Sequence, residues 1–163
     1  MFEIGDHVVY GMTGVCRIAG VSTLPDHSNA EEDALFYVLA PIYEKITIYV
    51  PVDDVKTPMR KIMSVAEVEK LIDFIPQIRV RAYRENTIQE LAKIYKEKIV
   101  AFDCTELIEL TMSIYEKKQN GKHGAVDKRF MKLAEDLLFG EFAVVLGIPK
   151  EGVQDFIERR VGA

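Results

Sequence analysis

A tight turn followed by a short β-branched run opens the chain and constrains its fold more than any other feature. Gly5 and Asp6 lead into residues 8–10, which read Val-Val-Tyr, and Gly11 and Gly14 then reverse the chain. Turn residues that alternate with short β-branched runs are typical of antiparallel hairpins. A chain that begins in this way is expected to form a small antiparallel sheet.

Strand signals continue to about residue 58. Residues 15–21 predict a second strand, in which Gly20 indicates a bend or bulge. Residues 35–39 and 46–50 predict a third and a fourth strand, and a proline follows each of them closely. Short strands at close spacing favour a small twisted barrel of the SH3 or Tudor kind.

From residue 64 onward the apolar residues recur at helical spacing. Ser64, with Glu three residues later, forms a capping box, and Pro76 ends the helix that follows it. Residues 78–100 contain no Gly or Pro and are interpreted as one helix. Asp103 starts another helix, and residues 126–145 give the clearest helical pattern of the chain.

These patterns predict an α+β protein with two domains. An SH3/Tudor-like β-barrel is expected over residues 1–60, followed by an all-α helical bundle of four or five helices over residues 61–163. The helical segments are joined by short loops, which favour antiparallel neighbours.

Composition narrows the function classes. The chain has 163 residues, 48% of them hydrophobic, and no apolar run long enough to cross a membrane. No basic region followed by an apolar one stands at the start, so we expect a cytoplasmic location without membrane contact. Cys16 and Cys104 are expected to be reduced. No metal-ligand spacing, cofactor motif or catalytic motif is found, so we expect neither metal, cofactor nor enzymatic activity.

The charge balance bears on nucleic-acid binding. The chain carries 26 acidic and 21 basic residues, a net charge of −5, with an isoelectric point of about 5.3. Counterion release supplies much of the affinity of DNA-binding proteins and needs a basic surface. Any contact with DNA is therefore expected to be local, weak and assisted by a partner.

Several motifs in a shared order resemble one family. They are residues 5–10 with Gly14 and Val15, then residues 37–39 and 49–53, and in the second half residues 127–129 and 134–143. Together they resemble the CarD family of bacterial transcription regulators, whose polymerase-binding domain also occurs in the transcription-repair coupling factor. The resemblance implies a binding module that docks on the β subunit of RNA polymerase.

The resemblance also implies how the docking works. Family members add a strand edge to a strand of the β1 lobe, a mode in which main-chain hydrogen bonds supply affinity. The strand expected to do so here consists of Ile46, Thr47, Ile48, Tyr49 and Val50. Thr47 and Tyr49 are expected on one face and the other three on the opposite face. The alternative is an interior barrel strand with Tyr49 in the core.

In the family the helical domain lies near the upstream edge of the promoter bubble and contacts DNA. Two basic segments are candidates for weak, non-specific contacts, and their residues are Arg79, Arg81, Tyr83, Arg84, Lys122, Lys128 and Arg129. The second segment lies within residues 117–132, where six basic residues face one Asp, and Lys128 and Arg129 match the family's basic pair. The alternatives are a solvated helix start for the first segment and a solubilising loop for the second.

One departure from the family leaves other functions open. Better-known members carry a tryptophan that wedges against DNA, whereas this chain has no tryptophan. Tyr83 stands near the aligned position. The alternative function is a protein-interaction adaptor whose helical domain binds another protein and not DNA. A third is a small-molecule sensor with a pocket between the two domains. An exposed strand edge could also pair with a second copy of the chain, which would give a homodimer.

Overall fold

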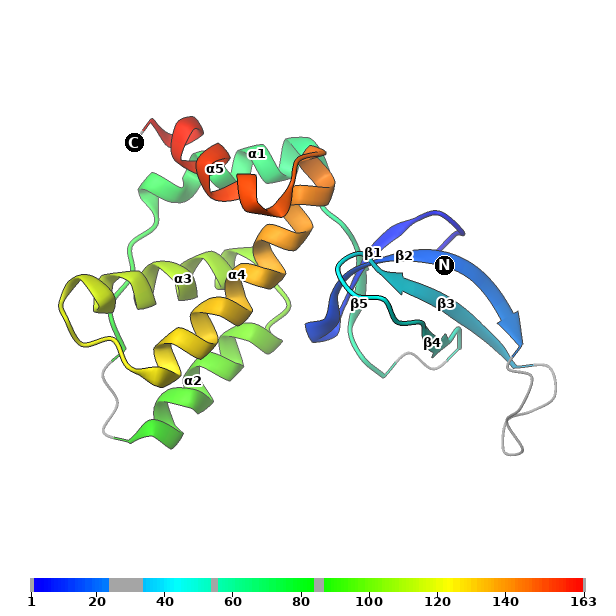
Figure 1. Cartoon of the computed structure of the whole chain (residues 1–163), viewed down its shortest axis with the longest axis horizontal. Helices are drawn as coiled ribbons and strands as arrows, with labels where there is room; N and C mark the ends of the chain where they lie inside the picture. Colours follow the sequence, from blue (N-terminus) through cyan, green and yellow to red (C-terminus); the bar gives the residue numbers. More distant parts are fainter. Residues whose placement is uncertain (1, 24–33, 54–55, 84–86, 163) are drawn as a thin grey trace. The chain divides into compact units, whose positions relative to one another are not determined.

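The computed structural model describes residues 2–23, 34–53, 56–83 and 87–162. The chain divides into two compact units, Met1–Ile62 and Met63–Ala163. Figure 1 shows that the first unit is built from strands and the second from helices. The α+β fold class with a β-rich N-terminal part is therefore confirmed.

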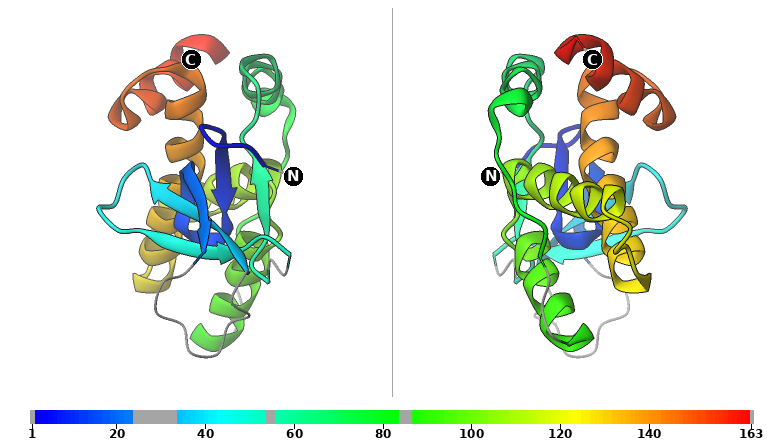
Figure 2. Two further views of the ribbon diagram at one scale, coloured as in Figure 1. Left: turned by 90° about the vertical axis from the view of Figure 1, so that its right-hand side faces the viewer. Right: turned by 90° about the vertical axis from the view of Figure 1, so that its left-hand side faces the viewer.

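The described residues of the first unit form a five-stranded antiparallel sheet with the order β4-β3-β2-β1-β5. Figure 2 (left) shows how strongly this sheet is twisted. Strand pairing among the described residues runs from β4 at one end to β5 at the other. The strands are β1 (His7–Tyr10), β2 (Gly14–Thr23), β3 (Leu35–Pro41), β4 (Ile48–Pro51) and β5 (Met59–Lys61).

One face of the sheet carries its hydrophobic core. Alternate side chains of the strands point to this face because successive residues of a strand point to opposite sides. The buried members are Val8, Cys16, Ile18, Tyr37, Leu39 and Val50. The turn between β1 and β2 requires a glycine at Gly11, whose φ is +47° and where a Cβ atom would lie 2.5 Å from Thr57 Cγ2.

The strands agree with the sequence in part. The predicted bulge is confirmed, because the β2–β3 register shifts between Ile18 and Gly20. The fourth strand starts two residues later than predicted, so Ile46 and Thr47 precede it. Strand β5 was missed: it has only three residues, two of them basic, and it is recognised only through its pairing with β1.

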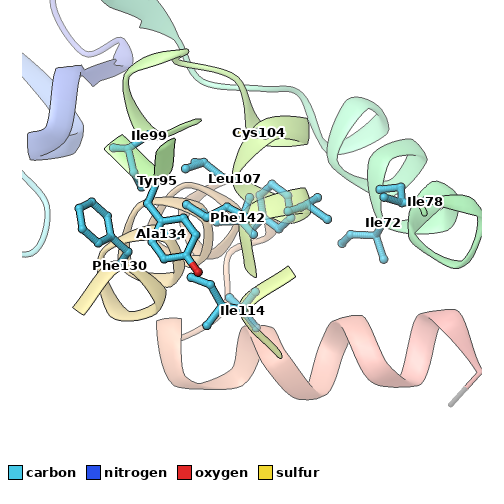
Figure 3. Packing of buried hydrophobic residues seen from close by; sticks show 14 of the residues in the cluster. Ile72, Ile78, Tyr95, Ile99, Cys104, Leu107, Ile114, Phe130, Ala134 and Phe142 are labelled. Atoms are coloured by element: carbon cyan, nitrogen blue, oxygen red, sulfur yellow. The ribbon is translucent and has the colours of Figure 1, made fainter. Parts of the chain in front are cut away.

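The described residues of the second unit form five α-helices around one core. Figure 3 shows that core, with the Tyr95 ring beside Phe130. The helices are α1 (Val65–Phe74), α2 (Ile88–Val100), α3 (Cys104–Gln119), α4 (Ala125–Leu146) and α5 (Val153–Val161), with 3-10 turns at Ile75–Gln77 and Lys150–Gly152.

Helix ends follow the predicted local signals. Ser64 and Glu67 form the predicted capping box at the start of α1, and a 3-10 turn containing Pro76 follows the end of that helix. The Asp103 carboxylate accepts a hydrogen bond from the Thr105 amide at 2.8 Å and so caps α3. The long helix α4 ends at Gly147, whose φ is +68°.

The prediction of one helix over residues 78–100 is wrong for residues 78–83. Helix α2 begins at Ile88, where the Thr87 hydroxyl accepts from the Glu90 amide at 3.1 Å. Residues 78–83 have no regular secondary structure. Ile78 is buried and Val80 packs on the core. Arg79 and Arg81, which alternate with them, are exposed. The alternation of charged and apolar residues therefore has the period of an extended segment and not that of a helix.

Candidate protein and nucleic-acid interfaces

Strand β4 is an edge strand whose backbone register is defined. It pairs with β3 through Val50 opposite Tyr37 and Ile48 opposite Leu39, and the Val52 amide donates to the Leu35 carbonyl at 3.0 Å. Hydrogen-bonded and non-hydrogen-bonded pairs alternate in an antiparallel ladder. The backbone groups of Ile48 and Val50 therefore point to β3, and those of Tyr49 point away from it.

The side chains of β4 divide between the two faces. Val50 is 2% exposed and belongs to the core, whereas Tyr49 is 47% exposed on the opposite face. There Tyr49 lies opposite Val38 of β3, and Pro51 lies opposite Phe36. The alternative that placed Tyr49 in the core is wrong, because Tyr37 is the buried tyrosine of this sheet. The outer face beside the β4 edge is thus apolar and partly exposed.

The opposite edge of the sheet is different. The Arg60 guanidinium donates to the Lys61 carbonyl at 3.2 Å, and the Lys61 ammonium lies 3.7 Å from the Asp6 carboxylate. Short length and charged side chains are common ways to keep an edge strand from pairing with another chain. Of the two edges, β4 is the better acceptor for an added strand.

The basic segment before α2 is held in place by local contacts. The Arg79 guanidinium donates to the carbonyls of Pro76 and Ile78 at 3.0 and 3.3 Å. The Arg81 guanidinium lies 4.9 Å from the centre of the Tyr83 ring, and that ring meets Tyr95 edge-on at 6.3 Å. Tyr83 is therefore half-buried between a cation and the core.

Arg84, the remaining member of this segment, lies outside the described residues. The interpretation of the segment as a helix start is wrong, since α2 begins four residues further on. Arg79 and Arg81 are exposed on an extended segment and can both face solvent.

The second basic segment surrounds the start of α4. Lys122, Lys128 and Arg129 are exposed, and the Arg129 guanidinium lies 5.1 Å from the centre of the Phe130 ring. Within the described part of the chain, Lys122 and Lys128 have no ion-pair partner. Lys122 precedes α4, and Lys128 and Arg129 follow its first residues, so all three belong to the start of this helix.

A buried ion pair accounts for part of the apparent basic excess in residues 117–132. The Lys117 ammonium lies 3.0 Å from Asp127 Oδ1, and both side chains are buried. The Tyr95 hydroxyl donates to the same oxygen at 2.6 Å, and the Gly124 amide donates to Asp127 Oδ2 at 2.7 Å. Lys132 in turn pairs with Asp136 at 3.0 Å. Two of the six basic residues therefore have acidic partners.

This Asp127 cluster, which comprises Tyr95, Lys117, Gly124 and Asp127, joins α2, α3 and α4. Burial raises the pKa of the Asp127 carboxyl, but the hydrogen bonds from Tyr95, Gly124 and Lys117 together hold it below its usual value. Burial, and then the hydrogen bond to Asp127, raise the pKa of Tyr95. The sequence gives no signal for this cluster, because its members are far apart along the chain.

A second buried carboxylate lies in the middle of α4. Glu141 Oε2 accepts from the Met63 amide at 2.9 Å, and its Oε1 lies 3.2 Å from the Cys104 thiol, which donates to it. Glu141 thereby joins the first residue of the helical unit to the start of α3 and to α4. Like Asp127, it is a structural group with protein partners and not an exposed binding residue.

The remaining chemistry of the described residues is limited. Cys16 and Cys104 are both buried and form no disulfide, and burial raises the pKa of Cys16 to about 11. Within the described ranges, His, Cys, Asp and Glu side chains form no group of three that could hold a metal ion. Across the same ranges, no helix has the length and hydropathy to span a membrane.

Comparison with known proteins bears on both units. Residues 2–63 match the family model of the CarD-like/TRCF RID domain. The whole chain is similar to "Putative transcription factor YdeB" of Bacillus subtilis (strain 168). The two are 22% identical over 160 residues, which cover 96% of this chain and 99% of that protein. These findings support a role related to transcription.

Proposed function

Residues 2–63 form a CarD-like/TRCF RID domain, a type that interacts with RNA polymerase, and from this premise we propose a specific docking mode. The chain is a transcription regulator whose edge strand β4 pairs with a strand in the β1 lobe of the polymerase β subunit. The observation that carries the proposal is the register of β4, in which the backbone groups of Tyr49 point away from β3.

Side chains support the same edge. Tyr49 and Pro51 on β4, with Phe36 and Val38 on β3, form a partly exposed apolar surface next to the outward backbone groups. An added strand would thus gain main-chain hydrogen bonds and bury apolar area together. Ile46 and Thr47 precede β4 and are both exposed.

Proline substitution tests this docking mode. Tyr49→Pro removes the outward amide and leaves the bonds to β3, so we expect binding to core RNA polymerase and to its isolated β1 lobe to weaken about tenfold or more. The matched control is Lys61→Pro, which removes an outward amide of β5 and should leave binding unchanged. Equal affinities for wild type and Tyr49→Pro would show that β4 is not the docking strand.

We further propose that the helical unit contacts upstream promoter DNA weakly within the polymerase complex. Lys122, Lys128 and Arg129 are the principal candidates because they are exposed and cluster at the start of α4. Arg79 and Arg81 are secondary candidates. Such contacts add little affinity alone, and the acidic net charge keeps the chain from binding DNA by itself.

Charge reversal tests the DNA contact. In Lys128→Glu/Arg129→Glu, the affinity of the polymerase complex for promoter DNA should weaken, while binding to the β1 lobe stays unchanged. The salt slope, which is the slope of the logarithm of this affinity against the logarithm of salt concentration, should fall in magnitude by about 2. Reversal of two exposed lysines on α2, Lys93→Glu/Lys96→Glu, is the matched control. An unaltered salt slope in the first variant would rule out phosphate contact there.

The second candidate function is that of an adaptor whose helical unit binds another protein. The observation that favours it is the placement of Tyr83, which packs between Arg81 and Tyr95 and so does not serve as an exposed wedge in place of the missing tryptophan. A ternary complex whose stability barely responds to salt would favour this function. In the absence of polymerase, a second copy of the chain is a further candidate for the β4 edge.

A further inference from the structure

An open apolar groove runs between helices of the second unit. Its volume is about 400 Å³ and it is lined by α3, α4, α5 and the segment that follows α1. On α3 the lining residues Ile108, Thr111, Met112, Tyr115 and Glu116 follow helical spacing, so they form one stripe. Tyr115 is 55% exposed, which is unusual for an aromatic side chain on a packed helix.

The charged residues that line this α3–α5 groove are all acidic. They are Glu116 on α3, Glu135 on α4 and Glu158 on α5, and no Lys or Arg is among its lining residues. Glu135 is half-buried and forms neither a hydrogen bond nor an ion pair with any described residue, because its neighbour Lys132 pairs with Asp136 instead. Burial, and then the charge of Asp136, raise the pKa of Glu135.

The acidic part of the groove has a defined end. Beyond Tyr115 and Met131 a second hollow of about 580 Å³ begins, and its lining includes Lys118 and Lys132. Lys118, Lys128 and Lys132 stand beside Glu135 and Asp136 in this second hollow, so cationic groups of a ligand are attracted most to the portion near Glu116 and Glu158.

We propose that the α3–α5 groove binds an amphipathic helix of a partner protein, with an apolar face flanked by Lys or Arg side chains. Met112 and Met131 supply an adaptable apolar floor, and an apolar groove between helices is a common acceptor for the apolar face of a further helix. The three glutamates select a basic rim on that helix.

This inference does not rest on the proposed docking of β4, because the groove contains no residue of the sheet. None of Lys122, Lys128 and Arg129 is among the residues that line the groove. Failure of the polymerase experiment would therefore leave it standing, and its own failure would leave the polymerase proposal standing.

The test uses the full chain with isotope-labelled methionine methyl groups and two synthetic helical peptides. Both peptides carry Leu at positions i, i+3, i+4 and i+7, one flanked by Lys and the other by Glu. We expect the Lys peptide to shift the Met112 and Met131 signals saturably and to leave the signal of Met59 in the sheet unchanged. No shift with the Lys peptide up to about 1 mM, the weak limit of specific affinity, would overturn the proposal.

Variants show whether the glutamates act as proposed. Glu135→Gln should weaken binding of the Lys peptide roughly threefold to fivefold, which is the effect expected from the loss of one partly exposed ion pair. Tyr115→Lys should abolish binding, and it changes an exposed side chain, so the unit should remain folded. Glu97→Gln on α2, outside the groove, is the control. Equal binding of the Lys and Glu peptides would refute the selection of a basic rim and overturn the proposal.

Discussion

The two units of the molecule treat their polar groups in opposite ways. The sheet unit turns backbone groups of β4 outward, where a partner can reach them. The helical unit buries charged side chains instead, and none of the buried side-chain nitrogen or oxygen atoms in the described residues lacks a hydrogen-bond partner. Unpaired backbone at a sheet edge is a binding feature, whereas a buried and fully paired charge is a structural one.

Within the sheet the same contrast separates the two edges. At β4 the outward backbone groups are those of Tyr49, whose side chain is exposed. At β5 the Arg60 guanidinium already donates to the outward Lys61 carbonyl. A partner strand would have to displace that contact and accommodate two basic side chains. The difference explains why only one edge is a good candidate for docking.

The largest effect is expected when the helical unit loses its buried carboxylate. Asp127→Ala leaves the Lys117 ammonium buried without its partner, so the free energy of unfolding of that unit should fall by about 3–5 kcal/mol. Residue-resolved amide hydrogen exchange of the full chain measures this while reporting the sheet unit separately. The control is Asp136→Ala, which breaks partly exposed ion pairs and should cost about 1 kcal/mol or less. Equal losses in the two variants would contradict a special role of burial.

The next effect concerns the direction of the backbone groups in β4. Ile48→Pro removes an amide that points to β3 and leaves the Leu39 carbonyl unpaired. The free energy of unfolding of the sheet unit should therefore fall by about 2–3 kcal/mol. Tyr49→Pro removes an outward amide and should cost less than about 1 kcal/mol. Hydrogen exchange of the β3 amides distinguishes the two variants. The opposite order of destabilisation would show that the register assigned to β4 is inverted.

A smaller effect is expected at the phenol that bonds to Asp127. Tyr95→Phe removes one hydrogen bond to a charged group and should cost about 1.5–2 kcal/mol near neutral pH. Because the pKa of Asp127 lies below its ordinary value of 3.8, the stabilisation exists above that value and disappears as pH falls through the lowered pKa.

The difference in free energy of unfolding between wild type and Tyr95→Phe should therefore become smaller as the solution is acidified below pH 3.8. Denaturant unfolding at a series of pH values measures it. A difference that stays constant down to the lowest pH would mean that Tyr95 stabilises the unit through packing alone.

The smallest effect is expected at the charged edge. Lys61→Ala removes an exposed contact with Asp6, so the free energy of unfolding of the sheet unit should change by less than about 0.5 kcal/mol. Thermal unfolding measures this change. A loss comparable to that of Ile48→Pro would mean that β5 uses its charges for stability rather than to discourage pairing.

Much of the fold could be predicted from local signals. The bulge at Gly20, the capping box at Ser64 and the start of α3 at Asp103 each depend on a few neighbouring residues, and each is confirmed. The absence of Gly and Pro over residues 78–100 does not separate the extended residues 78–83 from the helix, because neither residue type is needed to end a helical pattern. Strand β5 was missed because three residues carry too little pattern.

In the candidate sites, too, local features could be predicted, whereas features that depend on contacts between distant residues could not. The sequence places Tyr49 on a short strand, but whether its backbone points inward or outward depends on the register with β3, which only pairing reveals. Lys117 and Asp127 are separated by ten residues, and Tyr95 lies 32 residues from Asp127. No local pattern indicates such a contact, so counting charges along residues 117–132 overestimated the exposed basic surface.

Pro51 has a consequence for how the chain avoids aggregation. It occupies the next outward position after Tyr49 on β4 and has no amide hydrogen to offer. Within β4, the outward row therefore contains one donor, too few to template a continuous stack of identical chains. A partner strand can form a brief contact in a single register there, but the same edge is a poor seed for a growing fibre.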